Sequence, residues 1–492
     1  MKTQVNTDKN GSTLVALAKS LTSKPWFDSV IVLLMSLLLF YGASWQIFRD
    51  YTDVAKYQCY ALAFWEGLSA LHHLPIHQCT FITTYHYHAP SPHVIITLLQ
   101  HIGLPAFLLH FFAAQNNNAP FGALPHEYPW PVLIPFSLPL IVPAYWYQVA
   151  FAVLMALVAI FIYYVLLRTH SRRAALLYAF FLVLGTWGTA EGRFDLIPSA
   201  LTLLAVVYAV RKRWHWAFAY LALGTMFKFY PAVLLLPFLL AQQMESREPR
   251  FSWRRLLPLG TFVLICALIM LVSFVFSIQG TLEPFSYFGG RPIQVESASA
   301  TLLWLFSFVG FKLTPVFTFG SLNILSVLSP VVSILGILAL LLGLGYTYWL
   351  QWRGKLPLAP ACLLTLLIII YTGKVFSPQY LIWIVPLVAY VCPSDRKLLV
   401  SWTAICAVTT WIYPYIYNMA GLLQLPSVPI FFPVIALRNI LLLYFIVVLL
   451  RSHSRQTSMG QSFESVKKVD KEDGQARAAS IIPDSPTRVS GL

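Results

Sequence analysis

Charged residues are scarce in this chain, and long stretches contain none. Asp, Glu, Lys and Arg together make up 10% of the 492 residues, whereas apolar residues make up 58%. A soluble protein of this length carries about 25% charged residues. Uncharged apolar runs of about 20 residues, the length that spans a bilayer, recur from one end of the chain to the other. The composition excludes an ordinary soluble protein and predicts a multi-pass membrane protein.

Several common functional motifs are also missing. The six cysteines form no CxxC pair, and no Cys/His spacing typical of zinc is present. No Gly-rich phosphate-binding loop follows the apolar runs, which argues against a soluble nucleotide-sugar donor. The chain has no repeat of fixed period and no matching halves of the kind that inverted-repeat transporters show. We therefore expect neither a metal nor a cofactor.

Acidic residues are outnumbered, with 18 against 33 basic ones and a net charge of +15. The distribution of the excess argues against a nucleic-acid partner, because most Lys and Arg lie in the N-terminal segment, in the tail and in short connections between apolar runs. By the positive-inside rule these segments are cytoplasmic, so we expect a cell-membrane protein with both termini in the cytoplasm. The basic connections are 168–173, 211–213, 245–255, 351–355 and 393–397.

Alternating these connections across a membrane predicts an all-α polytopic protein with about twelve spans. A cytoplasmic segment (1–28) precedes a membrane domain (29–450), and a disordered cytoplasmic tail (451–492) follows it. Two long outer segments, 49–146 and 277–326, are expected to carry surface helices and loops. One such helix is the amphipathic stretch "YALAFWEGLSALHHL", which would lie along the membrane. The spans centre near residues 39, 156, 182, 203, 220, 238, 267, 338, 364, 386, 408 and 441.

The remaining charges are few, and several fall at predicted outer ends of spans. A charge near hydrocarbon costs at least about 2.5–3.5 kcal/mol, so it usually marks a site. Lys228 and Lys374 lie between apolar runs at outer ends, where the positive-inside rule disfavours lysine. Each lysine either snorkels toward water or holds an anionic group such as a lipid phosphate. Arg291 shares a loop with Gln294 and Glu296, side chains that suit sugar hydroxyls or a phosphate.

Two further clusters lie in predicted outer segments. Glu191, Arg193 and Asp195 in "TAEGRFDLIPSA" either form an ion-pair network that stabilises the turn or contribute to the site. In "TYHYHAP" an extended backbone places His86 and His88 on one face. No cysteine or carboxylate frames these histidines at ligand spacing, so acceptor contact is favoured over zinc.

The first outer segment also holds two cysteines and two aspartates of interest. Cys59 and Cys79 either form a disulfide or remain free thiols. Asp50 and Asp53 share a face if the first helix continues, and both also suit a helix N-terminus. We expect Asp50 to be a structural partner and Asp53 to take a proton from an acceptor hydroxyl. Outer-face cations would stabilise a departing lipid phosphate, which is group transfer from a lipid-linked donor.

Four segments, in this order, resemble the multi-pass C-type (GT-C) glycosyltransferases, and most closely the polyprenol-phosphate-mannose-dependent mannosyltransferases of glycosyltransferase family 87. They are "DVAKYQCYALAFWEG" (53–67), the stretch from "GRFDLIPSA" to "YPAVLLLP" (192–237), "RPIQVESASATLLWL" (291–305) and "KVFSPQYLIWIVPL" (374–387). The resemblance implies a GT-C-like fold and inverting transfer of a sugar, usually mannose, from a polyprenyl-phosphate donor without a metal. It also implies that the base is an aspartate of the first outer loop, which is Asp53 here.

The expected partners are a polyprenyl-phosphate-linked sugar donor, a lipid or glycan acceptor, and membrane lipids. The long, His-rich first outer segment departs from the family pattern and leaves the acceptor open. The predicted donor-phosphate residues are Lys228, Lys374 and Arg291. The predicted sugar or acceptor contacts are Asp50, Tyr57, His86, His88, Arg193, Asp195, Gln294, Glu296, Gln379 and Tyr380.

Two other classes of function fit part of the pattern. A polytopic transporter or a lipid or glycolipid flippase would also need charges within the membrane. Such a protein would carry those charges at mid-membrane in repeated halves, whereas here a first-segment carboxylate is combined with lysines at two later outer ends. A non-catalytic scaffold leaves Lys228 and Lys374 unexplained.

Overall fold

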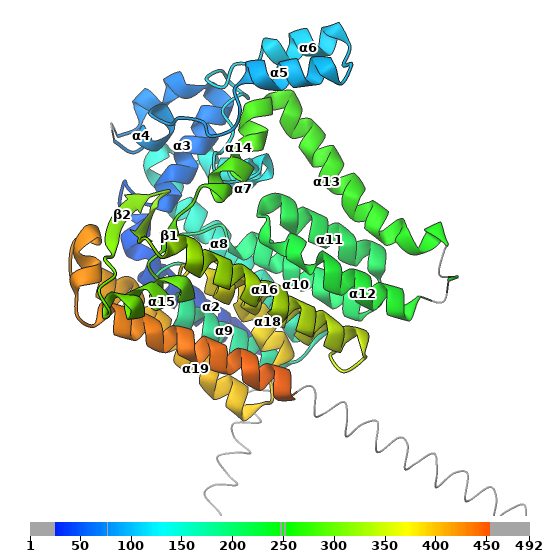
Figure 1. The fold of residues 1–492 in the computed structure, drawn as a ribbon, viewed down its shortest axis with the longest axis vertical. Coiled ribbons are helices and arrows are strands. Elements are labelled where there is room, and N and C mark those ends of the chain that lie inside the picture. The colour runs from blue at the N-terminus through cyan, green and yellow to red at the C-terminus, as the bar shows by residue number, and fades with distance from the viewer. Residues whose placement is uncertain (1–24, 76, 247, 250–251, 453–492) are drawn as a thin grey trace, which may run out of the picture.

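The structure is a computed structural model that describes residues 25–75, 77–246, 248–249 and 252–452. Most of the predicted cytoplasmic N-terminal segment and all but the start of the predicted tail lie outside these residues. The described chain is largely helical, with one small sheet (Figure 1). The predicted membrane protein with a helical fold is confirmed at this level, because six described helices are long and apolar enough to cross a membrane.

Each of the twelve predicted span centres lies within a helix of the described chain. The six long apolar helices contain α2 (Pro25–Ile47), α8 (Tyr147–Thr169), α13 (Leu257–Phe276), α16 (Ser329–Trp352), α19 (Arg396–Thr410) and the helix Phe431–Ser452. The other six are α9 (Arg172–Thr186), α10 (Leu196–Val210), α11 (Trp214–Phe227), α12 (Leu235–Glu245), α17 (Leu358–Thr372) and α18 (Tyr380–Val391). Twelve spans stay a prediction, because this second group is short.

Three of the short helices, α10, α17 and α18, lie inside the bundle. A helix of 15 residues, such as α10 or α17, is about 22 Å long, less than the roughly 30 Å of a hydrocarbon core. Most residues of α10, α17 and α18 are buried, so their ends meet protein instead of lipid. Irregular backbone at membrane depth is tolerated in such a place. The interior of the bundle can therefore contain broken helices with polar groups at the breaks.

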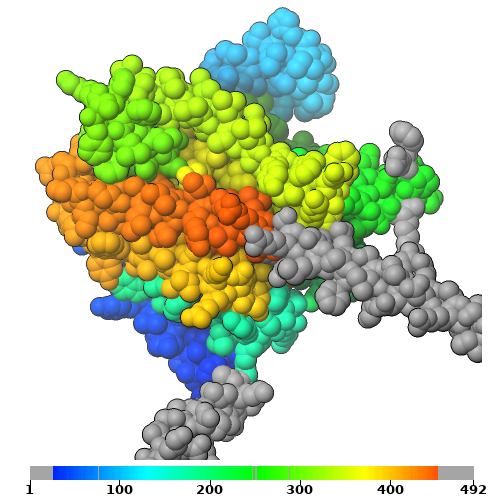
Figure 2. Space-filling model, turned by 60° about the horizontal axis from the view of Figure 1, so that its bottom comes forward, coloured from blue at the N-terminus to red at the C-terminus, as the bar shows by residue number. Residues whose placement is uncertain are grey.

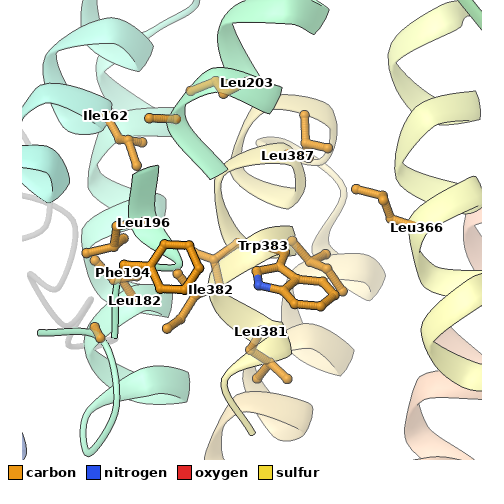
Figure 3. Close-up of a cluster of buried hydrophobic side chains, with 14 of the residues drawn as sticks. Ile162, Leu182, Phe194, Leu196, Leu203, Leu366, Leu381, Ile382, Trp383 and Leu387 are labelled. Atoms are coloured by element: carbon orange, nitrogen blue, oxygen red, sulfur yellow. The ribbon is translucent and has the colours of Figure 1, made fainter. Parts of the chain in front are cut away.

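The main core is formed by α8, α9, α10, α17 and α18. Figure 3 shows Leu182, Leu196 and Ile382 around the ring of Phe194, with Trp383 beside them. All five side chains are buried. Trp383 also lines the central cavity described below, and Phe194 contacts Lys228 of that cavity, so the core helps to fix one wall of the site.

By contrast, α13 and α16 are barely covered by protein. Only 6% of the most apolar stretch of the helix containing α13 is buried, and the value for α16 is 11%. Figure 1 shows α13 running along one side of the bundle, from the α11–α12 region to α14. These two helices present apolar surface that suits contact with lipid tails.

Elements of the two predicted outer segments gather at one end of the bundle (Figure 1). From the first segment they are α3 (Asp53–Glu66), α4 (Thr80–Thr83), α5 (Pro92–His101), α6 (Ala106–Ala113) and α7 (Leu133–Ser137). From the second they are α14 (Ile278–Gly289) and α15 (Ala298–Ser307). Several short 3-10 turns connect them. The open question about the cysteines is settled in favour of a disulfide between Cys59 on α3 and Cys79 before α4.

The prediction that "YALAFWEGLSALHHL" lies along the membrane surface is wrong for its first half. That half belongs to α3, which buries nine of its fourteen residues. The helix packs against α7 and α8, and the disulfide ties it to the following loop. The apolar face that resembled a membrane-binding surface instead contributes to the core.

The second outer segment contains a three-stranded antiparallel sheet that the all-α expectation did not include. Its strands are β1 (Ile293–Gln294), β2 (Thr314–Thr318) and β3 (Ser321–Leu325), in the order β1-β3-β2. Phe319 and Gly320, which we call the hairpin tip, connect β2 to β3 with φ angles of 52° and 64°. Two central residues with positive φ match a type I′ turn. The tip reaches the candidate site.

The α5–α6 pair is largely exposed. Val94, Leu98, Ile102, Phe107 and Phe111 are all exposed, and α6 buries none of its residues. Figure 2 shows this pair, in light blue, standing away from the rest of the molecule. Gln115 anchors the segment, because its side chain donates to the carbonyl of Phe274 at 2.8 Å at the end of α13.

Candidate functional site

Asp53 is the first residue of α3, and a short turn separates it from α2. Thr52 holds this turn by donating to the carbonyl of Gln46 at 2.8 Å. The first helix therefore does not continue, and Asp50 and Asp53 do not share a helical face. Asp50 is exposed, whereas Asp53 is partly buried and lines a cavity. Neither acts as the N-cap, because that position belongs to Thr52.

Two cations flank the Asp53 carboxylate. Arg193 Nη2 pairs with Oδ2, and Lys56 Nζ lies 3.8 Å from Oδ1. Burial raises the pKa of Asp53, but the positive charges of Arg193, Lys56 and Lys228 lower it by more. The pKa of Asp53 therefore lies below its usual value. Asp53 is thus an ionised carboxylate at neutral pH, oriented by an arginine.

The turn between α9 and α10 does not form the internal ion-pair network that its sequence permitted. Arg193 reaches Asp53 on α3, and Asp195 accepts from Lys228 Nζ at 2.6 Å. The indole N–H of Trp383 also donates to Asp195. Glu191 is 1% exposed, and both of its carboxylate oxygens lack a hydrogen-bond partner. The turn instead connects α3, α11 and α18.

The burial of Glu191 implies that the stability of the folded protein depends on pH. Burial raises the pKa of Glu191 from 4.5 to about 8. The folded protein therefore holds a proton that the unfolded chain releases, and the stability from this group declines as the pH rises between 4.5 and about 8. We expect the melting temperature in detergent to fall over this window. The fall should be shallower in Glu191→Gln, and parallel curves for the two proteins would contradict the assignment.

Lys228 follows the last residue of α11, where the helix breaks before Pro231. Its side chain is buried, with Nζ 5.0 Å from the ring centres of Phe194 and Trp383. The snorkelling alternative for Lys228 is wrong, because the ammonium group lies inside the protein. Lys374 differs, because its side chain is exposed. Its backbone carbonyl accepts a hydrogen bond from the Gln294 N–H at 2.9 Å.

A central cavity of about 220 Å³ brings many of these residues together. Its charged lining residues are the cations Lys56, Arg193, Lys228 and Arg291 and the carboxylates Asp53 and Glu127. The rings of Tyr230 and Tyr380 stack on Trp383 along its wall, with centroids 4.2 Å and 3.9 Å away. Cations outnumber carboxylates here, so the cavity suits an anionic group beside an aromatic wall.

Arg291 is the cation best placed to receive such an anion. Its guanidinium donates to Ser321 Oγ at 3.0 Å, and its Nε has no partner. In the described part of the chain, no carboxylate is ion-paired with Arg291, whereas Arg193 and Lys228 are each paired. The unneutralised charge can therefore bind a phosphate.

A second cavity of about 430 Å³ meets the central one at Asp53, Arg193 and Gln379. Gln294 and Glu296 also line it. The side-chain oxygen of Gln379 is buried without a partner, so it can accept from a bound hydroxyl.

Glu296 is not free to act as a base. Arg438 Nη1 donates to its carboxylate at 2.9 Å, and Tyr417 donates at 2.8 Å. Both members of the pair are almost fully buried. Glu296 lines the second cavity but not the central one, so it can contact a bound sugar only in the second cavity.

The remaining predicted residues lie elsewhere. His86 and His88 line a third cavity, and His88 Nδ1 lies 3.0 Å from Glu283. Tyr57 lies on the buried face of α3, and its ring stacks on that of Phe136 with the centroids 4.2 Å apart. It therefore packs α3 against α7 and does not line the site. In the described residues, no three His, Cys, Asp or Glu side chains gather into a group that could hold a metal.

Sequence reasoning missed several residues of the site. Glu127, Tyr287 and Trp383 all line the central cavity. Arg438 was overlooked as the partner of Glu296, although a lone arginine in the last apolar run is a recognisable signal of an intramembrane ion pair. Glu127 carried no comparable signal, since it lies in a Pro-rich loop.

Comparison with known proteins finds no matching family model, no matching curated protein and no matching solved structure. The resemblance to GT-C enzymes therefore stays a prediction. What the site itself offers is an ionised carboxylate, an uncompensated arginine and two adjoining cavities at one end of a helical bundle.

Proposed function

We propose that this protein is a membrane glycosyltransferase that moves a sugar, mannose by resemblance, from a polyprenyl-phosphate donor to an acceptor hydroxyl. The observation that carries the proposal is that Asp53 and Arg291 line the same cavity. Transfer from a lipid phosphate needs a base for the acceptor and a cation for the departing phosphate. The central cavity would hold the donor phosphate and sugar, and the second cavity would admit the acceptor hydroxyl.

The reaction is a single displacement. The acceptor oxygen attacks the anomeric carbon from the face opposite the phosphate, a new C–O bond forms, and the configuration inverts. The bond between that carbon and the phosphate oxygen breaks, and its electron pair stays on the phosphate. Asp53 takes the proton of the acceptor hydroxyl, and Arg193 orients Asp53. Arg291 and Lys228 stabilise the negative charge on the leaving phosphate.

The proposed orientation has about twelve spans, both termini in the cytoplasm and the site at the outer face of the cell membrane. The basic connections at 168–173 and 211–213 support it. The Cys59–Cys79 disulfide supports it independently, because disulfides persist in oxidising compartments outside the cytoplasm.

A direct test uses proteoliposomes with radiolabelled polyprenyl-phosphate-mannose and extracts of candidate acceptors. We expect the label to leave the donor in the presence of the wild-type protein and to appear in a new product. A transporter or flippase would move the intact donor between leaflets without chemical change. Relocation of unaltered donor with no loss of label would overturn the proposal.

Arg291→Met is expected to weaken donor binding by about 1.5–3 kcal/mol, the range for a lost hydrogen bond to a charged group. The substitution removes the uncompensated cation and keeps an unbranched, flexible side chain of shorter length. Donor affinity can be measured with the labelled donor and purified protein in nanodiscs.

Lys374→Met is the comparison variant for this measurement. The sequence placed Lys374 with the donor phosphate, but its side chain is exposed and does not line the central or second cavity. We expect its donor affinity to match the wild type. If Lys374→Met weakened donor binding and Arg291→Met did not, the donor phosphate would have to be bound by Lys374 and not by Arg291.

A further inference from the structure

A third cavity opens beside the two that contain Asp53. Its volume is about 960 Å³, larger than either neighbour, and we call it the aromatic cleft. Aromatic side chains form most of its lining, among them Tyr51, Tyr85, His88, His126 and Phe317. Lys56 and Glu127 are its charged lining residues. The cleft is therefore much less cationic than the central cavity.

The aromatic cleft is continuous with the proposed reaction site. Lys56 and Gly320 line all three cavities. Tyr51 and Phe317 line both the cleft and the second cavity, where Asp53 lies. A molecule in the cleft can thus reach Asp53 without crossing the donor phosphate site.

One buried carboxylate holds part of the cleft wall in place. Glu283 on α14 accepts from the Tyr85 hydroxyl at 2.7 Å and from the backbone N–H groups of His88 and Ala89 at 2.9 Å and 2.8 Å. The Glu283 side chain is completely buried. Because α14 belongs to the second outer segment, this contact joins the two outer segments and preorganises the wall.

A buried histidine in the cleft wall has a polar atom that lacks a protein partner among the described residues. His126 is 3% exposed, stacks on Tyr85 with ring centroids 3.6 Å apart, and has no hydrogen-bond partner for Nδ1. Burial lowers the pKa of His126 to about 4, so the ring is neutral at physiological pH. A neutral ring nitrogen suits a hydroxyl group better than an anion.

Two rings at the junction with the second cavity are exposed although they are large and apolar. Tyr51 is 71% exposed and Phe317 is 53% exposed. The C–H groups of one pyranose face pack well on an aromatic face, which carries partial negative charge. Exposed rings next to hydroxyl-binding groups therefore fit sugar rings.

We propose that the aromatic cleft is a binding site for the sugar rings of a neutral glycan acceptor, whose terminal hydroxyl then reaches Asp53 past Tyr51 and Phe317. The assignment rests on the proposed glycosyltransferase function and narrows its acceptor from lipid or glycan to a saccharide. The cleft gives the aromatic rings a role in choosing the acceptor, whereas the central cavity recognises the charge of the donor.

The test measures binding of a neutral probe, α-linked mannotriose, to the full-length protein in nanodiscs by saturation-transfer NMR. The double variant Tyr51→Leu/Phe317→Leu removes both rings and keeps apolar bulk. We expect mannotriose to bind the double variant about 3- to 10-fold more weakly than the wild type, the scale of lost aromatic contacts. The matched control is Tyr145→Leu/Phe308→Leu, which removes the same two ring types at positions 78% and 71% exposed outside the three cavities.

The outcomes separate this assignment from the proposed function. Mannotriose binding that falls in the cleft variant and not in the control shows that the cleft binds saccharide. If labelled donor is nevertheless never consumed, the glycosyltransferase proposal fails, and the cleft loses its role as an acceptor site but remains a saccharide site. If donor is consumed but mannotriose binds no protein, or binds both double variants equally, the cleft assignment is overturned and the enzyme proposal stands.

Discussion

Asp53→Asn should lower turnover by roughly 100-fold or more, the usual scale for a lost general base. Asparagine keeps the shape of the side chain and can still accept from Arg193, but it cannot take the acceptor proton. Donor affinity should change much less, because Arg291 and Lys228 remain. The measurement is release of labelled sugar from the donor per unit time, with donor binding recorded on the same preparation to show that the variant is folded.

Asp50→Asn is the control for Asp53→Asn. Asp50 is exposed and lies three residues away on the preceding turn, so the same chemical change there should have little effect on turnover. If Asp53→Asn were nearly as active as the wild type, the base would have to be another carboxylate of the site. Glu127 is the next candidate, because it lines the central cavity and its carboxylate accepts just one hydrogen bond from the described residues, from Tyr287 at 3.2 Å. Glu296 is excluded from that role because its side chain is only 2% exposed and its carboxylate is held by both Arg438 and Tyr417, whereas the Asp53 side chain is 22% exposed.

Arg438→Met should destabilise the fold by about 3–5 kcal/mol, the range for breaking a buried ion pair by removing one partner. The Arg438 side chain is 0% exposed and that of Glu296 is 2% exposed, so methionine would leave a carboxylate buried without its countercharge. Arg438 also donates to the backbone carbonyl of Glu296, which fixes the chain that follows β1. Thermal unfolding of purified protein in detergent measures the effect as a fall in melting temperature.

A second pair of variants separates charge from bulk. Arg213→Met makes the same change at an exposed position and should leave the melting temperature almost unchanged. Glu296→Gln added to Arg438→Met removes the orphan charge, so part of the lost stability should return. A double variant less stable than Arg438→Met would show that the destabilisation has another cause.

The positions of the helices and the gathering of charged residues at one site could both be predicted from the sequence, for the same physical reason. Charges are rare in an apolar chain because each is costly in a membrane. Charged residues that remain outside the basic connections are therefore expected to contact one another inside the protein. Asp53, Arg193, Lys228 and Arg291 come from three of the four segments quoted above, 53–67, 192–237 and 291–305, and all line the central cavity.

Sequence reasoning failed where pairing or local backbone decides the outcome. Whether Lys228 or Lys374 enters the protein depends on where the helix breaks, which their similar apolar surroundings do not reveal. Glu296 forms an ion pair with Arg438, which lies 142 positions away in the sequence, and no local sequence pattern predicts such a pairing. Tyr57 lies on the buried face of α3, and the face cannot be assigned until the turn after α2 is known.

The small sheet was missed for a related reason. β2 and β3 together span few residues between apolar helices, and neither strand alternates buried and exposed residues. In a chain dominated by apolar runs, such a pattern resembles part of a helix. The turn at Phe319 and Gly320 was the available signal, because glycine at such a position favours a tight hairpin.

The hairpin tip has a thermodynamic consequence. Gly320 has a φ angle of 64°, lines all three cavities and leaves space in which an added Cβ would lie 3.6 Å from Lys56 Nζ. A displacement of this one residue therefore changes the space available to donor and acceptor at once. Any coupling free energy between the two substrates that acts through the tip must be reciprocal. The factor by which bound donor changes acceptor affinity then equals the factor by which bound acceptor changes donor affinity, whichever substrate arrives first.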